Sequence, residues 1–324
     1  MINKEEIKQP YFLVVGCPRS GTTLLQRMLN AHPLLAIEND IDIIIQGLNK
    51  KQRRVLDNPP LDDNIIENVK KADRYSNFGF NEDRYYSIAN CSNTFRDFLS
   101  NLFAEFANNQ SKPFAGEKSA RYLQSIQLVD YLLPWVKYIH IIRDGRDVAL
   151  SKMKWAREGK GTGKLSLWKD EPIATCALAW RWQVLVGICY SQNTKSNNYI
   201  EIMYENLLNN TKMALESITN FLEIPYSDRM TEFYVGKTKN KSKLSSKNQW
   251  LPLTKGLRDW RKSMSSRDLE LFEAIAGDLL KYLGYEVMNK NISSSVKTIA
   301  ENSINWWQNE QKRPHISLND ITYN

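Results

Sequence analysis

The stretch GCPRSGTT, residues 16–23, contains the residue types that hold a phosphate-like anion. Its two glycines allow close backbone approach, Arg19 adds positive charge, and three hydroxyl side chains add hydrogen-bond donors. An apolar, β-forming run over Tyr11–Val15 precedes the stretch, and helix-forming residues follow it. The first amides of a helix lack intrahelical partners and carry the positive end of the helix dipole. We therefore expect an anion to bind where this loop enters its helix.

The loop differs at one position from the loop that binds ATP or GTP. Its spacing is close to G-x-x-x-x-G-K-[ST], but Thr22 stands where the lysine would be. That lysine normally reaches the β- and γ-phosphates of a triphosphate, so its absence disfavours ATP and GTP. The competing interpretation is a glycine turn that only joins a strand to a helix. It is disfavoured because the motif occurs here between a predicted strand and a predicted helix.

A second candidate anion site follows the β-forming run Val136–Ile142. The pattern after it predicts a helix over Asp147–Trp155, so Arg143 lies at the carboxyl end of a strand and Ser151 lies about one turn into the helix. Ligands of open parallel sheets bind outside the carboxyl ends of the strands. A local ion pair between Arg143 and Asp147 is the competing interpretation.

Further elements are predicted from local patterns. Apolar spacing predicts one helix over Ser92–Asn109 and another over Thr175–Ser191, and Asn198–Glu205 reads as a strand. A capping box at Ser265 begins a helix that stops at Gly284. The segment GEKSARY, residues 116–122, places Lys118 at the mouth of an element, where α/β sheets present ligand contacts.

The bulk composition is that of an ordinary soluble globular protein. The chain has 324 residues, of which 42% are hydrophobic and 25% charged, and we expect one domain over 1–324. The first ten residues are polar, which argues against a secretory signal. No apolar stretch is expected to reach the length of a membrane span. We therefore expect a cytoplasmic protein.

Cysteine and histidine positions favour neither a metal site nor a disulfide framework. The four cysteines include no C-x-x-C pair, and the three histidines do not cluster. His140, inside an apolar strand, is predicted to belong to the core. The net charge of +8 indicates an anionic partner without specifying its class.

The charge is concentrated late in the chain. Residues 236–262 carry nine Lys or Arg and one acidic residue, Asp259, which predicts a basic lid. Beyond the lid, residues 285–324 form a C-terminal extension. Its Trp306 and Trp307 indicate that the extension docks on another part of the protein.

Together these motifs resemble the sulfotransferases that use 3′-phosphoadenosine 5′-phosphosulfate (PAPS), of bacterial type. CPRSGTT is similar to the family's 5′-phosphosulfate loop, and IIRDGRDVALS, residues 141–151, to its 3′-phosphate motif. GEKSARY and YENL, residues 204–207, resemble two further family segments. The resemblance implies an α/β fold in which a P-loop-like parallel β-sheet is flanked by helices on both faces. It covers a donor-binding core of about residues 11–262.

The resemblance also implies a set of donor-binding residues. The 5′-phosphosulfate would be held at the first loop, the 3′-phosphate at the second motif, and the adenine near the tyrosine-bearing segment. The lid sequence KGLRDWR is similar to a family signature for the 3′-phosphate, and two serines precede it. The residues are Arg19, Ser20, Gly21, Thr22, Thr23, Arg143, Ser151, Tyr204, Ser245, Ser246, Lys255, Gly256 and Arg258.

The implied reaction is in-line transfer of a sulfonate from PAPS to an acceptor. Negative charge grows on the departing oxygen, and Arg19 and Lys118 would stabilise it. As in the tyrosylprotein branch, a carboxylate eight residues after the histidine of an H-P pair would be the base. That position is Asp40, and Glu38 is the second choice. No metal is required, because protein cations supply the compensating charge.

The acceptor is expected to be a small molecule, such as a natural product or metabolite, that presents a hydroxyl or an amine or carbamoyl nitrogen. Two other functions compete with this one. A P-loop nucleotide or small-molecule kinase would need the missing lysine and carboxylates for magnesium. A non-catalytic module for anions or nucleic acid would need a basic surface with interleaved aromatic residues, and the basic stretch offers only Trp250 and Trp260. No nucleic-acid partner is therefore expected.

Overall fold

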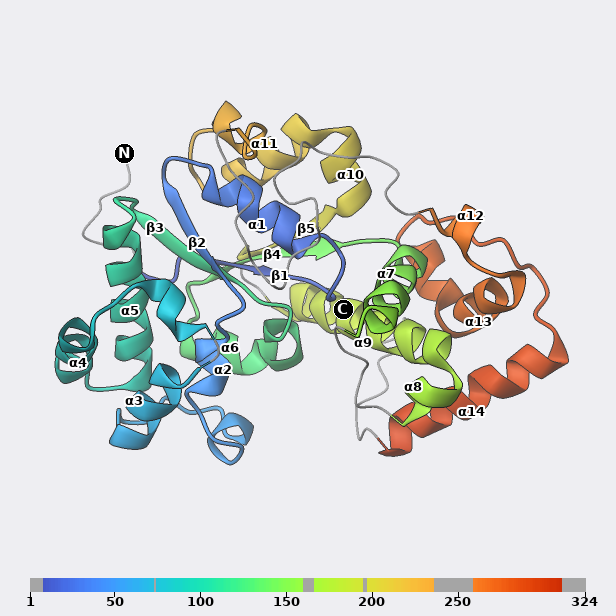
Figure 1. The fold of residues 1–324 in the computed structure, drawn as a ribbon, viewed down its shortest axis with the longest axis horizontal. Helices are drawn as coiled ribbons and strands as arrows, with labels where there is room; N and C mark the ends of the chain where they lie inside the picture. The colour runs from blue at the N-terminus through green and yellow to red at the C-terminus, as the bar shows by residue number, and fades with distance from the viewer. Residues whose placement is uncertain (1–7, 73, 160–165, 195–196, 236–258, 311–324) are drawn as a thin grey trace. The chain divides into compact units, whose positions relative to one another are not determined.

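The computed structural model describes residues 8–72, 74–159, 166–194, 197–235 and 259–310. These residues form two compact units, each described here by itself. The sheet unit takes described residues from 8–16, 21–141 and 197–235, and the helical unit takes those from 17–20, 142–194 and 259–310. Figure 1 labels their helices and strands. The single domain expected over 1–324 stays a prediction.

A five-stranded sheet organises the sheet unit, with the strand order β2-β3-β1-β4-β5. Strand β1 pairs in parallel with β3 and with β4, and β2 pairs in parallel with β3. Their carboxyl ends therefore share one edge, where ligands of such sheets bind. The strands are β1 (Phe12–Val15), β2 (Leu35–Asn39), β3 (Phe114–Lys118), β4 (Lys137–Ile142) and β5 (Tyr199–Met203).

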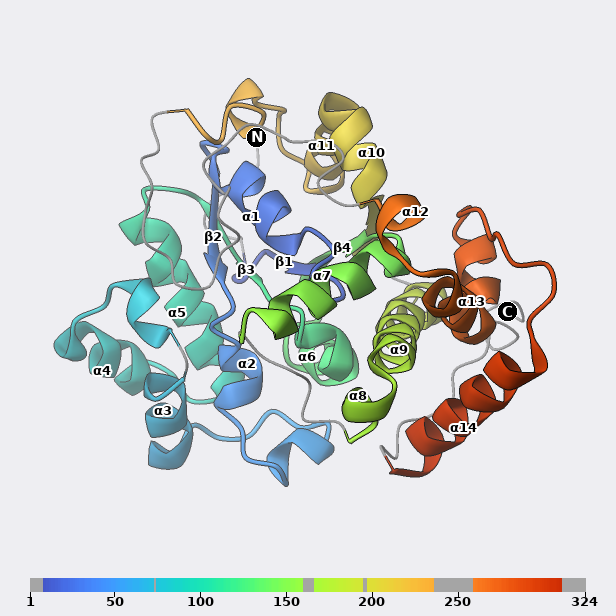
Figure 2. The same cartoon turned by 45° about the vertical axis from the view of Figure 1, so that its right-hand side comes forward.

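One face of the sheet packs against α1 (Thr22–Asn30) and α11 (Thr211–Phe221). Alternate strand residues point to the same face, so Phe12 and Val14 of β1 join Ile139 of β4 in one buried cluster with these helices. Figures 1 and 2 show α1 and α11 on this side of the sheet and α5 and α6 on the other. The sheet is thus parallel and flanked by helices on both faces, as the resemblance implied.

The opposite face is covered mainly by α5 (Phe95–Asn109), which confirms the helix predicted over Ser92–Asn109. The apolar spacing that predicted this helix consists of six residues, all of them buried: Phe95, Phe98, Leu99, Leu102, Phe103 and Phe106. Thr94 and Asp97 cap its start reciprocally. The other helices of the sheet unit are α2 (Ile43–Gln46), η2 (Gln52–Arg54), α3 (Asp63–Lys70), η3 (Tyr75–Phe78), α4 (Glu82–Asn90), η4 (Tyr122–Ser125), α6 (Ile126–Leu132), α10 (Tyr204–Asn209) and η5 (Asp228–Met230).

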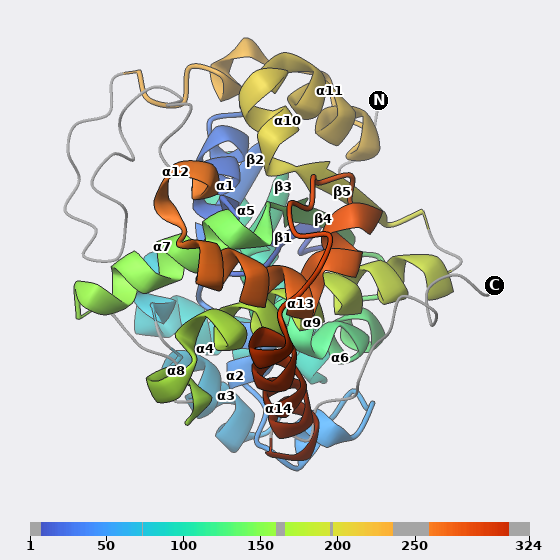
Figure 3. The same ribbon diagram turned by 90° about the vertical axis from the view of Figure 1, so that its right-hand side faces the viewer.

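The helical unit is built around α9 (Pro172–Asn193), which packs against α7, α13 and α14. Figure 3 shows α9 beside α13. Trp307 of α14 is buried beside Trp182 of α9, with ring centroids 6.5 Å apart, so the predicted docking is confirmed for Trp307. The other helices are α7 (Gly145–Arg157), α8 (Leu167–Asp170), α12 (Trp260–Ser263), α13 (Ser266–Tyr282) and α14 (Ser294–Glu310).

The expectation that no stretch has the length of a membrane span was wrong for α9. By length and composition this helix of 22 residues could cross a membrane. In the structure, however, 72% of its most apolar window is buried inside the protein. A helix that is apolar on all sides is also typical of a protein core, and α9 is surrounded by other helices of its unit.

Two strand assignments differ from the sequence-based expectations. Strand β3 was not predicted, because FAGEK contains a glycine and two charged residues, although all five residues are buried in the sheet. The strand expected over Asn198–Glu205 ends at Met203, and Tyr204 begins helix α10. Tyr204 therefore lies just beyond the carboxyl end of β5.

His140 is fully buried in β4, as predicted for a core residue, and it makes stability depend on pH. Its Nδ1 lies 2.6 Å from the Tyr199 hydroxyl, and burial lowers its pKa to about 3. In the unfolded chain the imidazole of His140 is protonated near pH 6.5, whereas in the folded protein it stays neutral down to about pH 3. The free energy of unfolding is therefore highest above pH 6.5 and falls as the pH drops toward 3.

Between pH 7 and pH 5, the free energy of unfolding should fall by about 2 kcal/mol less in His140→Leu than in the parent. Urea unfolding at the two pH values measures this difference. Tyr199→Phe is the control, because it removes the hydrogen bond and keeps the imidazole, so its pH dependence should match that of the parent. Equal pH dependence in parent and His140→Leu would contradict the assignment.

Candidate active site

The glycine loop is shaped by two positions that admit no side chain. A Cβ at Gly16 would lie 2.6 Å from the carbonyl oxygen of Ile141. Gly21 has φ +95°, and a Cβ there would overlap the ring of Tyr204. Gly21 is also the N-cap of α1 and, as a glycine, has no side chain with which to cap this helix. The start of α1 thus keeps its backbone N–H groups at the loop, as an anion site requires.

Tyr204 lies against this loop from the first turn of α10, which explains why Gly21 must be glycine. The resemblance placed Tyr204 near the adenine of the donor, and the structure places its ring beside Gly21. Thr22 is buried and Thr23 is partly exposed at the start of α1. Their contacts with a donor stay predictions.

In the helical unit, Arg19 and Ser151 contact each other directly. Arg19 adopts φ +82°, and its Nε donates to the Ser151 hydroxyl over 2.9 Å. The guanidinium also lies 4.2 Å from the centre of the Trp155 ring. The structure therefore joins a predicted 5′-loop residue to a predicted 3′-phosphate residue. Trp155 was not singled out, although its position four residues after Ser151 puts both on one helix face. Ser20, next to Arg19, is almost fully buried.

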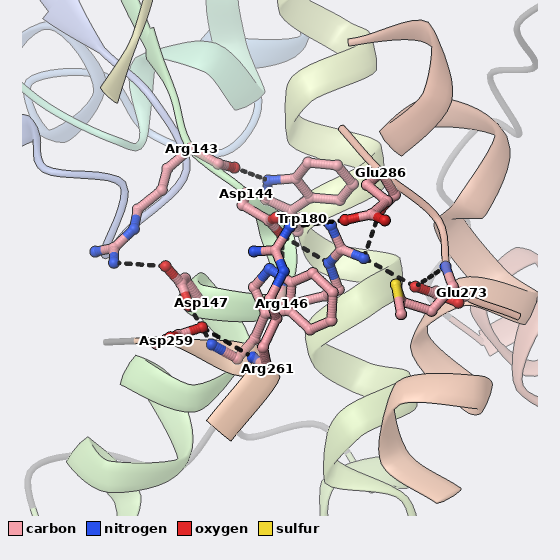
Figure 4. A network of polar contacts seen from close by, with 11 residues as sticks. Arg143, Asp144, Arg146, Asp147, Trp180, Asp259, Arg261, Glu273 and Glu286 are labelled. Carbon is pink, nitrogen blue, oxygen red and sulfur yellow. Dashed lines mark hydrogen bonds and ion pairs between the residues drawn. The ribbon is translucent and has the colours of Figure 1, made fainter. Parts of the chain in front are cut away.

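Arg143 is held by two neighbours at the carboxyl end of β4 (Figure 4). Its Nη2 lies 3.0 Å from Asp147, and its carbonyl accepts from the Trp180 indole over 3.0 Å. The local ion pair considered from the sequence is therefore present, at the position where the resemblance places a phosphate ligand. Asp147 also accepts from the backbone N–H of Trp260 over 3.0 Å. Burial raises the pKa of Asp147, and the charge of Arg143 opposes that rise.

Arg146 fixes the turn that follows Arg143, and sequence reasoning missed it. Its guanidinium makes two hydrogen bonds to Asp144, at 2.8 and 3.0 Å, and one to Glu273 at 2.8 Å (Figure 4). It lies 3.7 Å from the centre of the Trp260 ring. Arg146 is only 1% exposed, so these are desolvated contacts. They tie the start of α7 to α13 and hold the backbone around Arg143.

In the sheet unit, Lys118 and Asp40, each predicted separately to take part in catalysis, form an ion pair. Lys118 ends β3, and its Nζ lies 2.6 Å from Asp40 Oδ2. The backbone N–H of Asp40 donates to the Lys118 carbonyl over 2.8 Å. Lys118 is 3% exposed, and this burial lowers its pKa against the opposing effect of Asp40. A buried ammonium is suited to stabilising developing negative charge.

Glu38, the second candidate base, lies in β2 and has a different environment. It accepts from the Asn39 backbone N–H over 2.9 Å and from the Asn77 side chain over 3.2 Å. Burial raises its pKa, and hydrogen bonds and Arg74 oppose that rise. Asp40, in contrast, makes ion pairs with Lys118 and Arg74. Asp40 therefore has charged hydrogen-bond partners, whereas the hydrogen-bond donors to Glu38 are amides.

A buried network anchors the turn that carries Asp40. Glu117, fully buried in β3, accepts from the Asp42 backbone N–H and from the Tyr122 hydroxyl, each over 2.5 Å. Burial raises the pKa of Glu117 to about 8. Asp42 in turn accepts from Ser119 and, over 3.2 Å, from Arg121. These residues were not predicted, and they hold the turn after β2 to the end of β3.

Part of the predicted site lies outside the described residues. This applies to Ser245, Ser246, Lys255, Gly256 and Arg258, and to the basic lid over 236–258. Within the residues that the structure describes, no group of three or more His, Cys, Asp or Glu side chains could hold a metal ion.

Comparisons with known proteins identify a family and several relatives. Residues 10–228 match the model of the sulfotransferase family. Protein-tyrosine sulfotransferase A of Caenorhabditis elegans is 25% identical over 232 residues, which are 70% of this chain and 54% of the relative. Protein-tyrosine sulfotransferase 1 of Danio rerio is 23% identical over 70% of this chain and 58% of its own length. The chain thus spans about half the length of the curated relatives it matches.

Solved structures share the fold. The sulfotransferase domain of the Synechococcus PCC 7002 olefin synthase has a TM-score of 0.60 and 19% identity, and the likeness covers 89% of this chain and all of that domain. Mouse sulfotransferase SULT7A1, complexed with PAP, has a TM-score of 0.50 and 14% identity, covering 92% of this chain and 90% of that one. At these identities the likeness concerns the fold alone.

Proposed function

Because this chain belongs to the sulfotransferase family, we propose that it transfers a sulfonate from PAPS to a hydroxyl of a small-molecule acceptor. The observation that carries the proposal is the loop at the start of α1, with two obligatory glycines, one of which is the N-cap and has no side chain to cap the helix. Such a loop suits an anionic group, and the absence of the Walker lysine at Thr22 disfavours a triphosphate.

Each unit holds residues that suit one anionic end of the donor. In the sheet unit, the backbone N–H groups of Thr22 and Thr23 at the start of α1 would hold the 5′-phosphosulfate. In the helical unit, Arg143 and Ser151 would hold the 3′-phosphate, and Arg19 already contacts Ser151. When bound, the donor supplies a sulfonate on a phosphate leaving group.

The sheet unit would supply the acid–base chemistry. The acceptor oxygen forms a bond to sulfur while the bond from sulfur to the bridging phosphate oxygen breaks, and that oxygen keeps the electron pair. Lys118 would stabilise the charge on the departing oxygen, and Asp40 would orient the acceptor hydroxyl and take its proton.

Adenosine 3′,5′-bisphosphate (PAP) is expected to raise the melting temperature without magnesium, and ATP with magnesium should have little effect. At 100 times its Kd, a ligand adds about 2.7 kcal/mol of stability. Differential scanning fluorimetry measures both ligands. Arg143→Ala should weaken the PAP shift, whereas Arg84→Ala, which removes an ion pair with Glu105, should leave it unchanged. An absent PAP shift in the parent would sink the proposed donor.

A peptide tyrosine is a second candidate acceptor, because the curated relatives are protein-tyrosine sulfotransferases. An amine or carbamoyl nitrogen is a further chemical option. Incubation with PAPS and three probes, p-nitrophenol, an aliphatic amine and a tyrosine-containing peptide, followed by mass spectrometry separates these classes. Sulfonation of the phenol without the peptide supports a small-molecule acceptor, and the reverse result supports the peptide.

A further inference from the structure

Asp40 is shared between two cations that come from different parts of the sheet unit. Lys118 Nζ lies 2.6 Å from Asp40 Oδ2, and Arg74 Nη1 lies 3.2 Å from the same oxygen. Arg74 also donates to the Asn39 carbonyl over 3.2 Å. Arg74 therefore contacts both the carboxylate and the backbone just before it.

The short helix η3, which follows Arg74, contacts both candidate bases. Arg74 is the N-cap of η3 and pairs with Asp40, while Asn77 within η3 donates to Glu38 over 3.2 Å. Phe78 at its end is 2% exposed and packs against the rings of α5, with centroids 5.3 and 5.6 Å away. This packing gives Arg74 a fixed base from which to reach Asp40.

The two cations cannot serve Asp40 in the same way during the reaction. Lys118 must direct its charge to the departing oxygen, and a close carboxylate partner neutralises that charge. Arg74 approaches Asp40 independently of Lys118, so it can retain the carboxylate while Lys118 turns to the departing oxygen. Arginine suits this task because its charge is permanent, and its Nη1 alone donates to both the Asn39 carbonyl and the Asp40 carboxylate.

We propose that Arg74 is a positioning residue, which holds the Asp40 carboxylate in place so that Lys118 is available to the departing group. The role in turnover rests on the proposed function. The contact behind this proposal does not rest on the proposed function, because Arg74 bonds to Asn39 and Asp40 in the structure itself.

Arg74→Gln is expected to lower kcat about tenfold with PAPS and p-nitrophenol, while the KM for PAPS and the PAP-induced thermal shift stay unchanged. Arg74→Lys keeps the charge and should recover most of kcat. Arg84→Ala is the matched control, because it removes another arginine ion pair of the sheet unit. An unchanged kcat in Arg74→Gln, or an equal loss in Arg74→Lys, would overturn the role in turnover.

A second measurement separates this proposal from the proposed function. Hydrogen exchange at the amides of residues 39–42 requires no turnover, and Arg74→Gln should accelerate it while Arg84→Ala should not. Unchanged protection would overturn the contact as a positioning device. A parent that neither binds PAP nor sulfonates any probe would overturn the proposed function, and the exchange result would still decide whether Arg74 positions Asp40.

Discussion

Lys118→Ala is expected to lower kcat about 10²–10³-fold, the usual cost of removing one donor that stabilises developing charge. Lys118 is 3% exposed at the end of β3, so its charge acts in a poorly solvated position. In this variant Asp40 retains Arg74 as a partner. The hydrogen bond from the Asp40 backbone N–H to the carbonyl of residue 118 does not involve the lysine side chain. The fold should therefore persist. Turnover with PAPS and p-nitrophenol, measured as PAP release, gives the effect.

The control for Lys118 is another lysine of the sheet in a structural ion pair. Lys137 begins β4, so it lies at the opposite edge of the parallel sheet, where it bonds to Glu223 and to the Phe221 carbonyl. Lys137→Met should cost stability and leave kcat unchanged. If Lys118→Ala retained the parent's kcat, Lys118 would have no part in charge stabilisation. A loss in both variants would indicate a general structural effect.

The strands and helices of the two candidate anion-binding motifs were predictable because their signals are local. At the first, an apolar β-forming run, a glycine loop and helix-forming residues occupy one continuous stretch, and the structure has β1 and α1 there. At the second, the same order gives β4 and α7. Strand β3 was missed because its residues have low strand preference, and pairing with β1 and β2 imposes the conformation.

The pairings within the candidate site were not predictable from spacing. Lys118 and Asp40 are 78 positions apart, and Arg19 and Ser151 are 132 positions apart. The resemblance named these residues individually but not their contacts. Arg74 stands in a polar stretch where a charge reads as solvated. Only the tertiary fold brings it to Asp40, so sequence reasoning could not find it.

Arg146→Met is expected to destabilise the protein by about 3–5 kcal/mol, because it leaves buried carboxylates without their cation. Asp144 and Glu273 both bond to the guanidinium, and Glu273 is 5% exposed. Methionine keeps much of the side-chain volume, so the loss reflects charge more than an empty space. Urea unfolding at pH 7 measures the change.

Two variants test whether uncompensated charge causes this loss. Glu273→Gln in the Arg146→Met background removes one stranded carboxylate and keeps an oxygen for the backbone N–H of Met288, so it should recover part of the stability. Arg181→Met, which breaks an ion pair with the half-exposed Asp278, should cost no more than about 1 kcal/mol. Equal losses for Arg146→Met and Arg181→Met would contradict the argument. A large loss confined to Arg146 would mean that the turn carrying Arg143 depends on buried charge compensation, which ties the candidate 3′-phosphate site to the stability of the helical unit.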